Sequence, residues 1–185
     1  MISDESLVER TLAGDMSSFE ELVERHRDLV LRVTRRIVGP SDAEDVTQDA
    51  FLRAFHRLRQ FRGDSPFRAW LLRIAHNSAL NSIARPRTEV ETEESTADAI
   101  PDPTRMPADQ LEVSERRERL ALKLREVQPS HRTVLVLRDL EGLTYQEIAD
   151  ITETPLGSVK GRLFRARMEL IEVLRRNTYD WELPA

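Results

Sequence analysis

The chain has 185 residues, a formal net charge of −5 and only six glycines. This length allows one domain or two small ones and excludes a large enzyme core, and the abundance of helix-forming residues favours an all-α fold. Because the chain has no cysteine, disulfides and thiolate metal sites are excluded, which fits a reducing cytoplasm. No apolar run reaches the length of a membrane span and residues 1–10 lack the pattern of a signal peptide, so we expect a cytoplasmic protein without direct membrane insertion.

Apolar residues at helical spacing predict the first two elements. Those between residues 7 and 12 indicate a short first helix. Ser17 and Glu20 then form the pattern of a capping box, and the apolar spacing that follows predicts a long amphipathic helix. Gly39 and Pro40 end this helix.

The next predicted helix opens with an acidic face. Ser41 and Glu44 form a second capping-box pattern, and residues 46–58 carry an apolar stripe. Acids in the first turn of a helix interact favourably with the helix dipole. This effect does not explain Asp49, which lies beyond the first turn. The polar face runs from acid to base through Asp42, Glu44, Asp45, Gln48, Asp49, Arg53 and Arg57. Such a surface suits docking against a charged partner helix.

A third helix, predicted to begin at Pro66 after a short loop, carries polar residues suited to nucleic acid. At about 100° per residue, a stripe flanking its apolar face contains Trp70, Arg73, Asn77 and Asn81. Asparagine offers donors and acceptors to base edges, and arginine pairs with phosphates. This stripe is typical of a surface that binds single-stranded DNA.

Aromatic residues near this stripe leave two interpretations open. Phe61, Phe67 and Trp70 could stack on bases, each stack contributing about 1–3 kcal/mol. Aromatic residues at helical spacing are more often buried, however, so the same residues also fit a role in the core.

The acidic segment that follows divides the chain. Residues 88–113 contain eight acids and one base, so the rest of the chain carries a net charge of +2. Three prolines and few large apolar residues make ordering of this segment unfavourable. The predicted parts are an N-terminal helical domain over 1–85, a flexible acidic linker over 86–113, a C-terminal helical domain over 114–177 and a tail over 178–185.

The C-terminal domain contains the clearest motif of the chain. Two helices over 111–127 and 130–140 are expected first, followed by a helix-turn-helix over 140–170. Thr144 and Glu147 form a capping box, which predicts a helix beginning there. This motif makes DNA the first partner to consider.

The second helix of the motif is rich in cations. Pro155 ends the preceding helix, and helical periodicity resumes over 156–174. Between Gly157 and Met168 there are four cations and no acid. The N-terminal part of such a helix enters the major groove, so the residues expected to face DNA are Ser158, Lys160, Gly161, Arg162 and Arg165.

Taken together, three blocks of sequence carry a family resemblance. They are DAEDVTQDAFLRAF from Asp42 to Phe55, FRGDSPFRAWLLRIAHNSALN from Phe61 to Asn81, and the C-terminal helix-turn-helix, in this order and separated by a variable linker. The chain resembles the extracytoplasmic-function (ECF, group IV) sigma factors of bacterial RNA polymerase, of the sigma-70 family. The resemblance implies two small helical domains, sigma-2 and sigma-4.

The resemblance also implies three sets of site residues. The block that grips the β′ clamp helices of core polymerase contains Asp42, Glu44, Asp45, Gln48, Asp49, Phe51 and Arg53. The set that captures a flipped base and reads the minus-ten element contains Phe61, Arg62, Gly63, Asp64, Ser65, Trp70, Arg73, Asn77 and Asn81. The set that reads the minus-thirty-five element as a duplex contains Thr144, Ser158, Lys160, Gly161, Arg162, Phe164 and Arg165.

Further partners follow from the same resemblance. Sigma-4 would contact the β flap of the polymerase, and the acidic linker would run toward the RNA-exit path. An anti-sigma factor is a further expected partner, which would hold the protein at the inner membrane face. Two positions depart from the family, because Lys160 stands where arginine is frequent and Gly161 where serine is common.

Three hypotheses of function are compared with the residue pattern. The leading hypothesis is an alternative sigma factor that directs promoter-specific initiation, without catalytic residues, cofactor or metal of its own. The first alternative is a stand-alone helix-turn-helix regulator, which would leave the stripe on the third helix without a role. The second is a metal-dependent hydrolase using Asp42, Asp45 and Asp49, which is disfavoured because no histidine lies among them.

Overall fold

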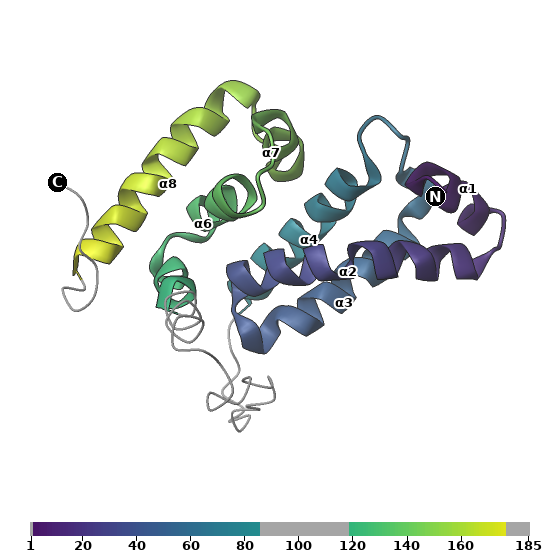
Figure 1. Cartoon of the computed structure of the whole chain (residues 1–185), viewed down its shortest axis with the longest axis horizontal. Helices are drawn as coiled ribbons and strands as arrows, with labels where there is room; N and C mark the ends of the chain where they lie inside the picture. Colours follow the sequence, from purple (N-terminus) through teal and green to yellow (C-terminus); the bar gives the residue numbers. More distant parts are fainter. Residues whose placement is uncertain (1, 86–118, 177–185) are drawn as a thin grey trace, which may run out of the picture.

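Helices make up all the regular structure of the described residues, which are 2–85 and 119–176 in this computed structural model. Figure 1 shows them as two helical units side by side, and the expectation of an all-α fold with two small helical domains is confirmed. The predicted linker over 86–113, the start of the helix over 111–127 and the tail over 178–185 lie outside the described residues.

Five elements form the N-terminal unit. They are α1 (Asp4–Leu12), α2 (Met16–Val38), α3 (Pro40–His56), the 3₁₀ turn η1 (Leu58–Gln60) and α4 (Phe67–Ala84). The long second helix ends at Gly39, as its sequence predicts, because Gly39 has a φ of +99° that L residues with a side chain rarely adopt.

The capping predicted for α2 and α3 is wrong. Asp15, not Ser17, caps α2, since its carboxylate accepts the Ser17 backbone N–H at 3.1 Å and the Ser18 hydroxyl at 2.8 Å. Helix α3 has no side-chain cap, because it begins at Pro40, whose fixed φ suits the first helical position and which has no N–H to satisfy. The Ser41–Glu44 pattern therefore falls inside the helix.

Helix α4 is the central element of the molecule. It packs against α2 and α3 on one side and against α7 (Tyr145–Thr152) of the C-terminal unit on the other. Most of its residues are accordingly buried, including Phe67, Leu72 and His76. A helix that is buried nearly all round needs both units to cover it.

The C-terminal unit contains the predicted helix-turn-helix. Residues 119–126 are helical, α6 (Pro129–Leu135) continues into a π-helical turn η3 (Val136–Leu140), and α7 (Tyr145–Thr152) and α8 (Leu156–Arg176) follow. The capping box of Thr144 and Glu147 is confirmed, with both of its hydrogen bonds present. Glu153 ends α7 in the left-handed conformation, with a φ of +50°.

One hydrophobic core runs through both units. It joins apolar side chains of α1 to α4 with those of α6 to α8, which the sequence does not predict. Within the described ranges, no helix is long and apolar enough to cross a membrane. No group of three or more His, Asp or Glu side chains in these ranges is placed to hold a metal ion.

Candidate nucleic-acid and protein interfaces

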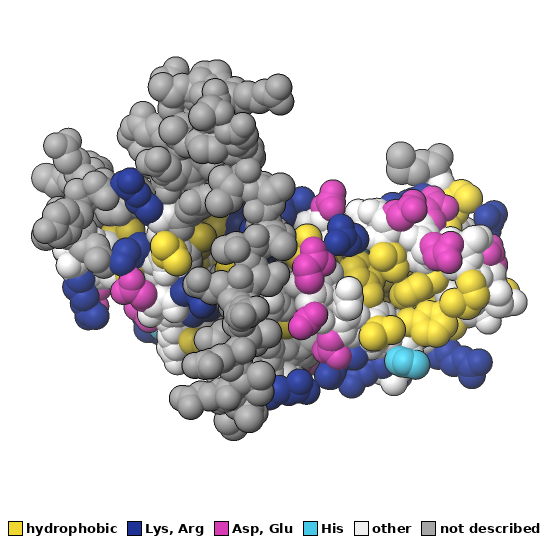
Figure 2. All heavy atoms as spheres, turned by 90° about the horizontal axis from the view of Figure 1, so that it is seen from below, with side chains coloured by type: hydrophobic (Ala, Val, Ile, Leu, Met, Phe, Trp, Pro, Cys, Tyr) yellow, Lys and Arg dark blue, Asp and Glu magenta, His cyan; other side chains and the backbone are white. Residues whose placement is uncertain are grey.

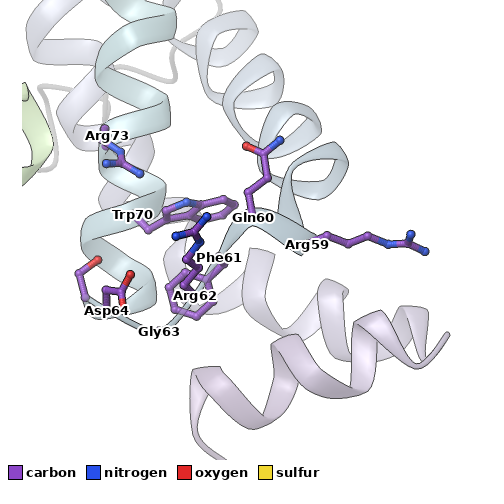
Figure 3. Close-up of a pocket in the computed structure, with 9 residues that line it drawn as sticks. Arg59, Gln60, Phe61, Arg62, Gly63, Asp64, Trp70 and Arg73 are labelled. Carbon is purple, nitrogen blue, oxygen red and sulfur yellow. The ribbon is translucent and has the colours of Figure 1, made fainter.

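A pocket of about 550 Å³ opens where η1, the following loop and α4 meet. Its lining residues are Arg59, Gln60, Phe61, Arg62, Gly63, Asp64, Ser65, Trp70 and Arg73. In Figure 3, Phe61, Arg62 and Trp70 overlap in the middle of the view, with Arg73 above them on α4 and Asp64 below on the loop. Gly63 has a φ of +75°, so the loop turns in a region of backbone space that favours glycine.

The aromatic residues of this region differ in burial, and not all of them line the pocket. Phe67 is only 1% exposed and Trp70 7%, so Phe67 packs in the core and offers no face for stacking. Phe61 is half-buried, and its ring lies 5.5 Å from those of both Phe67 and Trp70. The core interpretation therefore holds for Phe67, while Phe61 and Trp70 form an apolar wall of the pocket.

Cations surround the pocket mouth. Arg59 and Arg62 are exposed and Arg73 is half-buried, and none of the three has an ion-pair partner among the described residues. Unpaired guanidinium groups beside an apolar wall can bind phosphates while a base enters the pocket. Arg59 and Gln60 are additions to the predicted set, and their place directly before the loop was the signal that could have identified them.

Two asparagines extend this surface along α4. Asn77 and Asn81 are exposed, one turn apart, on a helix that is otherwise largely buried. Their amides are thus open to a ligand that continues beyond the pocket.

The outer face of α3 is a second candidate interface. Asp45, Gln48 and Glu44 are exposed, and Asp45 has no ion-pair partner among the described residues. Asp49 pairs with Arg53 at 2.6 Å. Partial burial raises the pKa of Asp49, but the hydrogen bond and the charge of Arg53 outweigh it, so this pKa lies below its ordinary value. The Asp49 carboxylate is therefore charged at neutral pH.

Leu52 is a feature of this face that the sequence reasoning missed. It is 61% exposed and lies two turns beyond Asp45, on the same stripe. Its position off the apolar face, at i+7 from an exposed acid, was the available signal. Phe51, which the prediction includes, is instead buried against the core.

An apolar area continues from this stripe. Figure 2 shows acidic side chains beside apolar ones toward the end of the molecule that carries α1. On α1 to α3 the exposed large apolar side chains are Leu12, Met16 and Leu52. Acids next to exposed apolar side chains are typical of a protein-docking surface.

The outward face of α8 is the third candidate interface. Ser158, Lys160, Phe164 and Arg165 are exposed, and Phe164 is 67% exposed without any packing role. The buried face of the same helix holds Val159, Leu163, Ala166 and Val173. In the structure this helix has a packing face and a cationic face, as its sequence predicts.

Local contacts hold several of these cations in place. The Lys160 ammonium lies 5.7 Å from the centre of the Tyr145 ring, and Arg138 lies 4.8 Å from the same ring. Arg162 donates to the Thr154 hydroxyl at 2.9 Å. Thr144 has its hydroxyl engaged with Glu147, at 2.9 Å, within the capping box. The turn and α8 therefore present a pre-arranged basic surface.

Comparison with known proteins places these interfaces in a family. Residues 22–88 match the family model of sigma-70 region 2 and residues 117–170 that of sigma-70 region 4. The ECF RNA polymerase sigma-E factor of Haemophilus influenzae is 34% identical over 179 residues, which cover 92% of this chain and 94% of the relative. The chain belongs to the ECF sigma factors. It is an alternative sigma factor, and the sequence-based expectation of this family is confirmed.

Other relatives of this sigma factor agree. The sigma-E factor of Escherichia coli strain K12 is 36% identical, covering 90% of this chain and 91% of the relative. The solved structure of CnrH in complex with the cytosolic domain of CnrY matches 95% of this chain and 99% of CnrH, with 29% identity and a TM-score of 0.68. The sigma factor RpoE of Bartonella quintana, solved in complex with the anti-sigma factor NepR, shares the fold at 21% identity and a TM-score of 0.64, over 86% of this chain and 98% of RpoE.

Proposed function

We propose that this sigma factor binds core RNA polymerase through α3 and reads a promoter with two surfaces, the pocket with α4 and the outward face of α8. It acts as a specificity subunit and has no catalytic activity of its own. The observation that carries this proposal is the presence, in one chain, of a pocket that has room for a base and is flanked by unpaired arginines, together with an acid-free cationic helix face.

The pocket suits a single unpaired base. Its apolar wall of Phe61 and Trp70 can cover the face of a base, and Gln60 and Asp64 supply donors and acceptors at the rim. Extruding a base from a duplex costs a few kcal/mol, which the contacts in the pocket must offset. The unpaired cations Arg62 and Arg73 would hold the adjoining phosphates, and Asn77 and Asn81 would read the bases beyond the captured one.

The face of α8 suits a duplex. Ser158, Lys160 and Arg165 are exposed near the N-terminal part of the second helix of the motif, which is the part that enters a major groove. Phe164 offers an apolar surface to a thymine methyl. Arginine is frequent at the position of Lys160 in the family, and lysine offers a point charge in place of a planar guanidinium. We therefore expect base readout there to be weaker than with arginine.

The acidic stripe on α3 suits a basic or mixed-charge helix of the polymerase. Asp45, Gln48 and Leu52 combine charge, hydrogen bonding and apolar area on one exposed stripe. Phe51 would support this stripe from within the core. The relatives CnrH and RpoE are solved in complexes with CnrY and with the anti-sigma factor NepR. We therefore expect an anti-sigma factor for this protein as well.

Substitution of Asp45 is the most direct test of the proposed polymerase site. Asp45→Arg should weaken binding to core polymerase at least tenfold, because a like charge would then face the basic partner. Asp45 is a better choice than Asp49, since Asp49 also pairs with Arg53 within α3. Glu24→Arg, at an exposed position on α2, is the matched control and should leave the affinity unchanged.

The whole function is tested by run-off transcription with core polymerase on a genomic library. A sigma factor should give discrete start sites that share two separated elements, and these sites should vanish without the protein. Duplex binding by the chain alone, with no polymerase-dependent transcripts, would instead identify a stand-alone regulator. An unchanged core affinity for Asp45→Arg would reject the α3 assignment.

A further inference from the structure

Lysine is rare in this chain, and one lysine lies on the outward face of α8. Of the 28 lysine and arginine residues, only Lys123 and Lys160 are lysines. Lys123 pairs with Glu126 at 2.6 Å, whereas Lys160 is exposed and has no ion-pair partner among the described residues. The Lys160 ammonium lies instead 5.7 Å from the centre of the Tyr145 ring. At such a distance the negative face of a ring attracts a cation.

The Tyr145 ring is held in place by the first turn of α7. Thr144 caps this helix and exchanges two hydrogen bonds with Glu147, so the backbone of Tyr145, the first helical residue, is fixed. The ring is half-buried and packs against the hydrophobic core. A lysine side chain is long and flexible, and ordering it costs rotamer entropy. A fixed ring can therefore order the Lys160 side chain before DNA is bound.

A second cation lies against the same ring. The Arg138 guanidinium is 4.8 Å from the ring centre and donates to the Leu143 carbonyl at 2.7 Å. Arg138 belongs to η3 and Lys160 to α8, so the ring brings together cations from two elements that flank α7. Neither cation has an ion-pair partner in the part of the chain that the structure describes. The start of α7 is therefore a place where an anion can meet two positive charges.

The place of the ring determines which part of a duplex Lys160 faces. In a helix-turn-helix, the second helix lies in the major groove and the first helix crosses the phosphate backbone. Tyr145 is the first residue of that first helix, so its ring draws the Lys160 ammonium toward the backbone side of the motif. Resting on the proposed function, this geometry directs Lys160 to a phosphate and away from the base edges.

We propose that Tyr145 is a positioning residue for DNA binding, whose ring holds the Lys160 ammonium beside Arg138 for contact with a phosphate of the duplex. Without the ring, Lys160 keeps its charge, but its side chain must be ordered when DNA binds, which lowers the affinity. The loss is the same for every DNA sequence, because a phosphate contact carries no sequence information.

The two lysines make the ring contact measurable without DNA. In the full chain labelled with ¹³C-lysine, only Lys123 and Lys160 give signals. The ring current should shift the Hε protons of Lys160 upfield. Tyr145→Leu should remove this shift, and Tyr145→Phe should retain it because the ring is kept.

Lys123 is the internal control for this measurement. Its signal should be the same in all three proteins, because its partner is Glu126. Helical circular dichroism of Tyr145→Leu should match that of the parent, since leucine keeps an apolar side chain against the core. A Lys160 signal in the parent at the position of a fully solvated lysine would overturn the proposal.

A double-substitution cycle measures the coupling of Tyr145 to Lys160 in DNA binding. With core polymerase and a promoter found by run-off transcription, Tyr145→Leu should weaken the closed complex about twofold to fivefold, which corresponds to an exposed cation–π pair. Tyr145→Phe should bind nearly as well as the parent. In a Lys160→Ala background, Tyr145→Leu should have little further effect, because Arg138 keeps its bond to the Leu143 carbonyl. An equal loss in both backgrounds would overturn the positioning role.

Single-base variants of the element bound by α8 separate a phosphate contact from base reading. Tyr145→Leu should weaken binding to every variant by the same factor as to the original promoter. A change in the ranking of the variants would overturn the assignment to a phosphate. Absence of polymerase-dependent transcripts with the parent chain would reject the proposed function, and the lysine signals would still decide whether Tyr145 holds Lys160.

Discussion

Helices α4 and α8 carry the two candidate DNA surfaces and are built in opposite ways. Helix α4 is largely buried, so it offers a ligand mainly its first turns beside the pocket and the exposed Asn77 and Asn81. Helix α8 is buried along one stripe and exposes its cations over several turns. A rigid, enclosed helix suits the capture of a flipped base, whereas an amphipathic helix can lie in a groove.

Two phenylalanines give the sharpest contrast between these helices. Phe67→Ala should destabilise the protein by about 3–5 kcal/mol, because Phe67 fills the core beside Phe61 and Trp70. Phe164→Ala should change stability by less than about 0.5 kcal/mol, since its side chain is exposed. Urea denaturation measures both, and similar losses for the two variants would contradict the contrast.

Acid should destabilise the protein through α4, because α4 contains the buried His76. Burial lowers the pKa of His76 to about 4, with Glu153 raising it and Arg162 lowering it further. The unfolded chain therefore binds more protons between pH 6.5 and 4, and stability falls as pH falls through this window. We expect a loss of about 2 kcal/mol between pH 7.5 and 5.

Substitution at two histidines checks the source of this loss. His76→Gln should remove most of the pH dependence, while His56→Gln, at an exposed position, should leave it in place. Denaturation of the three proteins at pH 7.5 and pH 5 gives the comparison. An unchanged slope in His76→Gln would show that other groups carry the acid sensitivity.

The two surfaces should also differ in how salt affects DNA binding. Lys160→Ala and Arg165→Ala should each reduce the slope of log K against log salt by about 1, because each removes one phosphate contact. Asn77→Ala and Asn81→Ala should leave this slope unchanged and cost about 1–2 kcal/mol each in promoter opening. Footprinting of closed and open complexes over a salt series distinguishes these effects, and an equal loss at both stages would reject the role of the asparagines.

A small gain in stability is expected at the glycine inside α8. Gly161→Ser should raise stability by about 0.5 kcal/mol, because glycine is a poor helix former. A Cβ at this position would meet only the Arg165 side chain, at an ordinary contact distance of 3.6 Å. Thermal melting measures the gain, and a loss of stability would mean that Gly161 is required for packing.

The elements that sequence predicts well are those whose pattern is local. Helix α8 and the Thr144–Glu147 cap follow from periodicity and from two residues three positions apart. The Ser41–Glu44 pattern fails because Pro40 begins α3 one residue earlier, although that signal was also present in the sequence. Two local patterns can therefore predict different starts for one helix, and the sequence alone does not show which start is adopted.

The contacts between the units have no local pattern at all. Arg36 and Glu141 are 105 positions apart, and each resembles many other charged residues of the chain. The pocket is an intermediate case, since its loop was predicted but the contribution of Arg59 and Gln60 depends on how η1 folds back. Burial also decides between Phe61, which lines the pocket, and Phe67, which does not.

Arg132 of α6 is buried and donates to the carbonyl of Ile37 at the end of α2, and this bond has a consequence for hydrogen exchange. It satisfies an acceptor in the last turn of α2, a turn that also holds the Gly39 amide through its bond to Arg35 at 3.0 Å. Without the Arg132 guanidinium, this turn loses its outside partner and should fray. The exchange rate of the Gly39 amide therefore reports, from within the N-terminal unit and without a label, whether this contact between the units is made.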